Sequence, residues 1–201
     1  MSDFIGMDRK LSDMMQEASK ESNQSGGMPW LSVEFFPPKT PAGVESLFRA
    51  LAKLQAFKPV FADVTWGAGG STSDLTIELC QRTKKNGTVP NMHLTCTNVD
   101  KQKIDEALAT CKESGITNIL ALRGDPPAGQ DKWEASDLAF TCALDLVRYI
   151  RKEYGDTFHL TVAGYPEGHP TKMTVVEGGV AALSASELKR YSVSTTETGE
   201  K

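Results

Sequence analysis

The sequence has no long hydrophobic run and no excess of positive charge. No apolar stretch in its 201 residues approaches the roughly 20 residues that a membrane-spanning helix needs. A formal net charge of -4 is unfavourable for binding nucleic acid or an anionic membrane. The N-terminal segment lacks the basic start and apolar centre of a signal peptide, and it is too acidic for a typical mitochondrial presequence. We therefore expect a cytoplasmic protein without nucleic-acid or membrane partners.

Cysteine is scarce, and its spacing argues against two further classes of protein. None of the four cysteines belongs to a CxxC pair or has a histidine at the spacing of a zinc ligand. We therefore expect neither a disulfide framework nor a metal site. The cysteines are expected to be buried as small hydrophobic residues. They are Cys80, Cys96, Cys111 and Cys142.

From Trp30 onward, short β-branched or apolar runs alternate with helical patterns. Strands are expected near residues 31–36, 60–65, 89–96, 118–122 and 159–163, with helices near 41–56, 73–85, 100–114 and 136–153. This alternation predicts βα units and a parallel sheet. Residues 1–29 are expected to form a helical arm and linker, residues 30–170 the barrel-type catalytic domain, and residues 171–201 a variable loop or insertion.

Two α/β architectures are compatible with this order, a doubly wound sheet and a (β/α)8 TIM barrel. A dinucleotide-binding sheet would carry G-x-G-x-x-G after its first strand, but here that strand ends in Pro37-Pro38. In a barrel, working residues lie at the C-terminal ends of several strands, as the candidates do here. We therefore predict the barrel. Because such a barrel takes about 250 residues, the chain is expected to supply about five of its eight βα units.

Glu34 is the ionisable residue within the apolar run of residues 31–36. The run stops at Pro37-Pro38, so Glu34 is expected near the end of a rigid strand. Burial against Phe35 and Phe36 would favour the protonated form of its carboxyl group, which a general acid needs near neutral pH. The alternative is an edge-strand glutamate that points at water.

Four further strand ends carry polar or aromatic residues, and each has a purely structural alternative. Trp66 could be a core aromatic residue, and His93 a hydrogen-bonded core histidine. Arg123 to Asp125 could form a tight turn with solvated charges, and Tyr165 to His169 a plain turn.

Five motifs taken together resemble the methylenetetrahydrofolate reductase family, and its eukaryotic members in particular. They keep the order and spacing of the family from about Leu31 to Pro170. The motifs are Glu34-Phe-Phe-Pro-Pro38, Asp63-Val-Thr-Trp66, His93-Leu-Thr-Cys96, Ala121-Leu-Arg-Gly-Asp125 and Ala163-Gly-Tyr-Pro-Glu-Gly-His-Pro170.

This resemblance implies a reaction and its participants. It implies a flavin-dependent (β/α)8 barrel that passes a hydride from NAD(P)H to FAD and then to 5,10-methylenetetrahydrofolate. The product would be 5-methyltetrahydrofolate, in one-carbon and methionine metabolism. The full-length family protein is expected to be a homo-oligomer.

The resemblance also assigns roles to residues. Glu34 matches the general acid of the family, and Asp125 matches the aspartate beside the flavin and the folate, so both are expected to contact substrate. Arg123 suits the cofactor's pyrophosphate, because its guanidinium binds phosphate oxygens in pairs. The expected cofactor-binding residues are Thr65, Trp66, Ala68, His93, Arg123, Gly124, Asp125, Ala163, Tyr165 and His169.

The likeness ends after Pro170. Residues 171–201 do not align with the flavin-binding helix and the later strands of the family. The chain is therefore expected to be a fragment that is inactive alone and at best a weak flavin binder. One alternative is a non-catalytic truncated barrel that binds flavin, or that associates with the full-length enzyme as a regulator. Another is an unrelated flavin or phosphate barrel.

Overall fold

The structure is a computed structural model that describes residues 9–24, 26, 29–67, 70–96, 99–124 and 140–164. The segment predicted at 171–201 lies outside these residues. The helices are α1 (Leu11–Gln24), α2 (Pro41–Leu54), the short 3-10 helix η1 (Gln55–Phe57), α3 (Ser73–Lys85), α4 (Lys101–Glu113) and α5 (Ala143–Tyr154). The strands are β1 (Val33–Phe35), β2 (Ala62–Val64), β3 (Pro90–Thr95), β4 (Asn118–Leu122) and β5 (His159–Val162).

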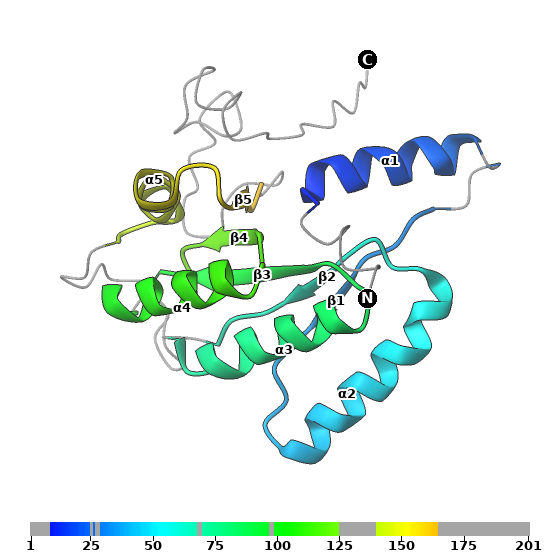
Figure 1. Ribbon diagram of the computed structural model, residues 1–201, viewed down its shortest axis with the longest axis horizontal. Helices are drawn as coiled ribbons and strands as arrows, with labels where there is room; N and C mark the ends of the chain where they lie inside the picture. The colour runs from blue at the N-terminus through cyan, green and yellow to red at the C-terminus, as the bar shows by residue number, and fades with distance from the viewer. Residues whose placement is uncertain are drawn as a thin grey trace, which may run out of the picture.

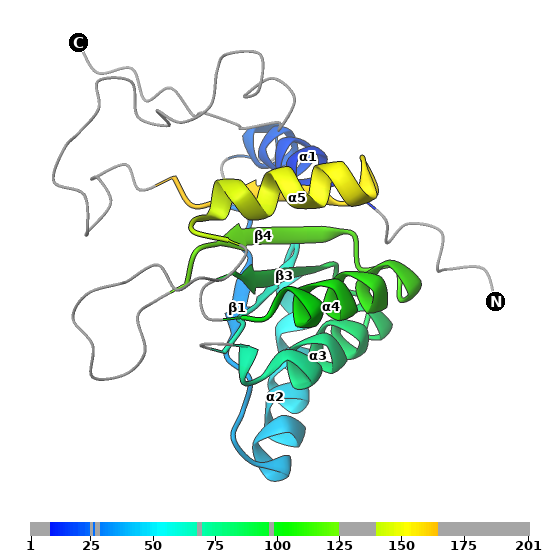
Figure 2. The ribbon, with the colours of Figure 1, turned by 90° about the vertical axis from the view of Figure 1, so that its left-hand side faces the viewer.

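The five strands form one parallel sheet in the order β1-β2-β3-β4-β5 (Figures 1 and 2). A doubly wound sheet reverses the direction of strand addition and places its first strand inside the sheet. Strands added in chain order are instead the arrangement of a (β/α)8 barrel. The predicted fold class is therefore confirmed. Within the described residues the sheet is open, with β1 and β5 at its edges.

One face of the sheet is apolar and is covered by helices. Successive residues of a strand point to opposite faces, so Val64, Met92 and Ile119 lie on the same side. Figure 2 shows α3, α4 and α5 along this side of the strands. Fully burying one such aliphatic side chain contributes about 1.5–3 kcal/mol, so this interface dominates the stability of the sheet. The helix residues buried in the same core include Leu79, Cys80, Ile104, Leu108, Leu146 and Ile150.

Local signals set where the helices begin. Thr40 is the N-cap of α2, and its side-chain oxygen accepts a hydrogen bond from Gly43 N at 3.1 Å. The predicted start of the last helix is wrong at residues 140–142, which are not helical. There, Thr141 donates from its backbone N and its hydroxyl to Asp145 Oδ2, at 3.0 and 2.6 Å. These bonds hold Thr141 outside the helix, which begins at Ala143.

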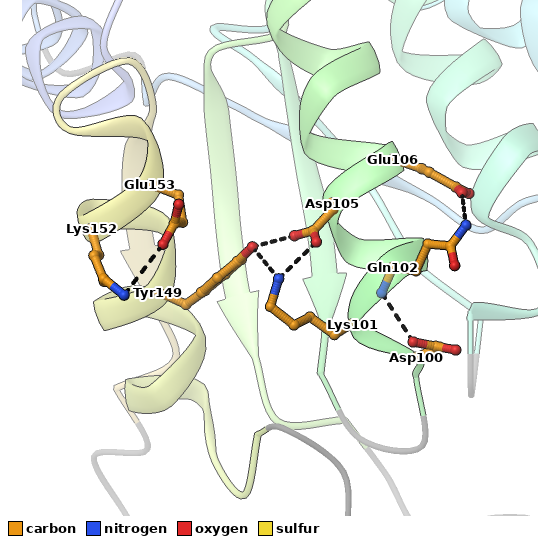
Figure 3. Close-up of polar contacts among 8 residues, drawn as sticks. All are labelled: Asp100, Lys101, Gln102, Asp105, Glu106, Tyr149, Lys152 and Glu153. Atoms are coloured by element: carbon orange, nitrogen blue, oxygen red, sulfur yellow. Dashed lines mark hydrogen bonds and ion pairs between the residues drawn. The ribbon is translucent and has the colours of Figure 1, made fainter.

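A polar group joins α4 to α5 above the apolar core (Figure 3). Lys101 Nζ lies 2.8 Å from Asp105 Oδ2 and 2.7 Å from the Tyr149 hydroxyl, which also bonds to Asp105. Burial and the bond to Asp105 raise the pKa of Tyr149. The Tyr149 ring packs edge-on against Phe140, with centroids 5.3 Å apart. These contacts fix α5 beside α4 on the helical side of the sheet.

Helix α1 lies apart from the row of α2 to α5 (Figure 1). Its Leu11 and Met14 are buried against Phe61 and Val89, which precede β2 and β3. The Asn118 side chain, 1% exposed at the start of β4, accepts from Leu11 N and donates to the Arg9 carbonyl, both at 2.9 Å. The helix in the predicted N-terminal arm is thus packed against the N-terminal ends of the strands.

The predicted burial of the cysteines is confirmed at three positions and wrong at one. All four thiols are free, and Cys80, Cys96 and Cys111 are buried. Cys142 is partly exposed because it occupies the N-cap position of α5, at the end of a helix. None of the described helices is both long enough and apolar enough to cross a bilayer.

Candidate functional site at the strand ends

The second face of the sheet carries a row of polar side chains, one from each strand. The register pairs Glu34 with Asp63, Asp63 with Asn91, Asn91 with Asn118, and Asn118 with His159. We call these five residues the polar row. Paired residues of neighbouring strands point to the same face, so the row crosses the whole sheet opposite the apolar core. Burial lowers the pKa of His159, which favours its neutral form.

Asp63, Asn91 and His93 form a hydrogen-bonded group on this face. Asn91 Nδ2 donates to Asp63 Oδ1 at 2.7 Å, and His93 Nε2 lies 3.2 Å from the same oxygen. Asn91 and His93 are buried, and the side chain of Asp63 is only 18% exposed. A carboxylate with so little access to water needs such partners. The alternative interpretation of His93 as a hydrogen-bonded core histidine therefore describes its surroundings in this structure.

Thr65 and Trp66 follow β2 and are buried where the strand ends. Thr65 continues the pairing with β1 through its backbone N, which bonds to the Phe35 carbonyl at 2.9 Å. Its own carbonyl accepts from the Thr76 hydroxyl at 3.0 Å. The Trp66 ring belongs to the apolar core, while its indole N–H has no hydrogen-bond partner among the described residues. Trp66 therefore has the surroundings of a core aromatic residue, with one polar atom unsatisfied.

A tight turn follows Trp66. Gly67 N donates to the Thr72 hydroxyl at 2.8 Å. A Cβ on Gly67 would lie 2.6 Å from Ser71 Oγ and 2.8 Å from Thr72 Oγ1, so only glycine fits there without displacing the turn. The glycine is therefore required by the packing of the turn itself, through the side chains of Ser71 and Thr72.

Arg123 and Gly124 follow β4, beside the end of β3. Cys96 Sγ lies 3.9 Å from the Arg123 carbonyl, and Cys96 N donates to the Leu122 carbonyl at 3.1 Å. Burial raises the pKa of the Cys96 thiol to about 12, although the Arg123 guanidinium acts in the opposite direction. Gly124 has φ +96°, a conformation that favours glycine. Ala163, after β5, is exposed.

The expected surroundings of Glu34 are not those in the structure. Glu34 is exposed, Phe36 is 74% exposed, and no hydrogen bond or ion pair joins Glu34 to another described residue. Two physical reasons explain the difference. Phe35 points to the opposite, helix-covered face, as the neighbour of any strand residue must. In addition, β1 is an edge strand, paired on one side only among the described residues.

The structure thus brings some of the predicted site residues to the same end of the sheet. Thr65, Trp66, His93, Arg123 and Gly124 lie at the C-terminal ends of β2, β3 and β4. Glu34 and Ala163 lie at the two edge strands of the same sheet. The other predicted residues fall outside the described part of the chain: Ala68, Asp125, Tyr165 and His169.

The sequence analysis gave no role to the partners of His93, although Asp63 is the first residue of one of the five motifs. Asp63 and Asn91 lie two residues before Thr65 and His93, and the period-2 spacing of polar residues in both strands is the signal that could have found them. A polar residue every second position indicates a sheet face that is not part of the apolar core.

Comparison with known proteins identifies the family. The family model described as methylenetetrahydrofolate reductase matches residues 19–187. The chain is 57% identical over 145 residues to methylenetetrahydrofolate reductase (NADH) 1 of Arabidopsis thaliana, covering 72% of this chain and 24% of that protein. It is 48% identical over 180 residues to a probable methylenetetrahydrofolate reductase (NADH) of Oryza sativa subsp. japonica. This match covers 89% of this chain and 30% of the rice protein.

A fungal relative gives a similar result. Methylenetetrahydrofolate reductase 2 of Schizosaccharomyces pombe is 48% identical over 165 residues, which are 81% of this chain and 25% of that protein. The chain therefore spans about a quarter to a third of the length of these relatives. With a family match over most of its residues and a sheet of the barrel type, this chain belongs to the methylenetetrahydrofolate reductase family.

Proposed function

We propose that this chain supplies flavin- and folate-binding strand ends of an enzyme that reduces 5,10-methylenetetrahydrofolate to 5-methyltetrahydrofolate with NAD(P)H. The observation that carries the proposal is the family match over residues 19–187, because that range includes every strand-end motif. The names of the Arabidopsis and rice relatives specify NADH, so NADH is the reductant to test first.

The residues present suit FAD as the cofactor. Asn91 Oδ1 and Thr95 Oγ1 are buried on the second face of β3 without a hydrogen-bond partner among the described residues. Buried polar atoms are nearly always paired, so these two atoms favour a polar ligand or water beside β3. Arg123 adds a guanidinium of the kind that binds phosphate.

Bound FAD would supply the site that accepts a hydride from NAD(P)H and passes it to the folate. We assign Thr65 and His93 to its binding from β2 and β3, and Arg123 to its pyrophosphate. Contacts along the cofactor are assigned to Trp66, Ala68, Gly124, Asp125, Ala163, Tyr165 and His169.

The two carboxyl groups are assigned to the folate. Glu34 would give its proton to a nitrogen of the methylene bridge as the bridge opens to an electrophilic iminium. The negative charge of Asp125 would stabilise that cation. Because Glu34 is exposed here, the apolar enclosure that keeps such an acid protonated has to come from parts of the working enzyme beyond the described residues.

The setting we propose is cytoplasmic one-carbon and methionine metabolism, with a homo-oligomeric full-length enzyme. We also propose that the 201-residue chain alone does not reduce folate. The support for this is that the described residues give five strands with unpaired edges at β1 and β5.

The test is Glu34→Gln in a chimera, in which this chain replaces the matching part of the Arabidopsis relative. Glutamine keeps the shape of the side chain but cannot donate the acidic proton. We expect folate reduction to fall at least about 100-fold, the lower range for a general acid, while NADH still reduces the flavin.

The matched control is Glu113→Gln, a change at an exposed glutamate in the last turn of α4. It should leave both half-reactions unchanged. Undiminished folate reduction by the Glu34→Gln chimera would remove Glu34 from the mechanism.

A further inference from the structure

Asp63 has no part in the roles assigned so far, yet it is the residue to which His93 is bonded. Its Oδ1 accepts a hydrogen bond from Asn91 Nδ2 at 2.7 Å and lies 3.2 Å from His93 Nε2. Asp63 and Asn91 are register partners on β2 and β3, and His93 lies two residues further along the same face of β3. One oxygen of the carboxylate is therefore shared by the Asn91 amide and the His93 imidazole.

This geometry constrains where the proton of His93 lies. An ionised carboxylate only accepts hydrogen bonds, and a neutral imidazole carries a proton on one of its two nitrogens. The nitrogen that faces Asp63 is Nε2, so Nε2 carries the proton and Nδ1 keeps a free lone pair. The Asn91 assignment is consistent, because turning that amide around would bring its oxygen against the carboxylate.

The same face of β3 carries further polar atoms that make no hydrogen bond to the described residues. Asn91, His93 and Thr95 alternate along the strand, and Asn91 Oδ1 and Thr95 Oγ1 are buried without partners in the described part of the chain. Nδ1 of His93 also has no hydrogen-bond partner among those residues, and it belongs to the same row of side chains along β3. Both Asn91 Oδ1 and the Nδ1 lone pair are acceptors, so this face of β3 favours a ligand that donates.

We infer that Asp63 is a positioning residue: it holds His93 in the Nε2–H tautomer, so that Nδ1 accepts a hydrogen bond from an N–H or O–H group of the ligand bound at the strand ends. Asn91 fixes Asp63 in place for this task. The identity of that ligand as a flavin rests on the proposed function, but the tautomer does not.

The test is a long-range ¹⁵N–¹H correlation spectrum of the histidine rings in the ¹⁵N-labelled 201-residue chain, without flavin, at pH 8. The chain has three histidines, and the His93 signals are assigned by their loss in His93→Gln. We expect one dominant Nε2–H tautomer for His93. In Asp63→Leu, which removes the acceptor but keeps the bulk, we expect a measurable population of the Nδ1–H tautomer to appear.

Two controls separate positioning from a loss of structure. His159 is buried in β5 and is not bonded to Asp63, so its signals should stay the same in a folded Asp63→Leu protein. Asp74→Leu, at an exposed aspartate in the first turn of α3, should leave His93 unchanged. If Asp63→Leu does not fold, Asp63→Asn is used, since its amide oxygen can still accept both bonds and should keep the Nε2–H tautomer.

A mixed or Nδ1–H population in the unmodified chain would overturn the inference, as would an unchanged spectrum in folded Asp63→Leu. Flavin binding is measured separately by absorbance. A locked tautomer without flavin binding would count against the proposed function alone, whereas flavin binding with a mixed tautomer would count against the role of Asp63 alone.

Discussion

At the scale of single residues, alternation along the strands decides which side chains can act together. Glu34 and Phe35 are neighbours in sequence but lie on opposite faces of β1, so Phe35 cannot enclose the Glu34 carboxyl. Asp63 and His93 are 30 residues apart in sequence but within hydrogen-bonding distance. The polar character of the second face therefore depends on strand register, which short motifs do not specify.

Cys96 gives a residue-scale prediction on pH. Burial raises the pKa of its thiol from 9.0 to about 12 in the folded protein. Below pH 9 the thiol is protonated in both states, and its contribution to stability is complete. Between pH 9 and about 12 only the unfolded state releases the proton, so the free energy of unfolding should fall as the pH rises.

Urea denaturation of the unmodified chain and of Cys96→Ala across this pH range measures the effect. Because lysines and tyrosines also titrate there, the relevant quantity is the difference between the two proteins. The decline should be shallower in Cys96→Ala. Equal slopes would mean that Cys96 is not protected from deprotonation by the fold.

At the scale of elements, one buried side chain hydrogen-bonds the start of helix α1 to the sheet, in addition to the apolar contacts of Leu11 and Met14. Asn118 satisfies the Leu11 N–H and the Arg9 carbonyl, and Asn118→Ala would leave both without these partners. We expect a loss of about 1–3 kcal/mol in the free energy of unfolding, the usual cost of unsatisfied buried polar groups. Urea denaturation monitored by tryptophan fluorescence reports it, since Trp30, one of three tryptophans in the chain, packs in the same cluster.

The control is Asn86→Ala, at an exposed asparagine that caps α3 through its backbone. Its effect should stay within about 0.5 kcal/mol. A loss in Asn118→Ala no larger than that in Asn86→Ala would show that the attachment of α1 does not depend on Asn118.

Elements with strong local signals were predictable from sequence. Helix α3 has the predicted bounds, and so does strand β4. The start of α5 was not predictable in the same way, because it depends on the bonds of Thr141 to Asp145 rather than on hydrophobic periodicity. The position of α1 was also beyond a sequence argument, since it depends on Phe61, Val89 and Asn118, far away along the chain.

At the scale of the whole molecule, strand order separates the two architectures that the sequence left open. Parallel strands in the order β1 to β5 bring the ends of β2, β3 and β4 to one edge, together with Thr65, His93 and Arg123. The apolar face then packs against the helices, and the polar face is the one to which we assign ligand binding. Sequence placed the site at the strand ends, but the hydrogen-bonded support from Asp63 required the assembled sheet.

The five-strand sheet also predicts how the isolated chain behaves. With unpaired edges at β1 and β5 among the described residues, and with Glu34 exposed, we expect the 201-residue protein to bind FAD weakly at most and to show no folate reduction. Flavin fluorescence titration and a turnover assay measure both. Turnover by the purified chain above that of a Glu34→Gln preparation would contradict this expectation.

The most direct measurement is the visible absorbance spectrum of the chimera that carries this chain in the Arabidopsis relative. If the strand ends form the flavin and folate site, the purified protein shows a bound-flavin band, which NADH bleaches and 5,10-methylenetetrahydrofolate restores. A folded but colourless chimera, or a flavin band that the folate does not restore, would contradict the assignment of this sheet edge to flavin-dependent folate reduction.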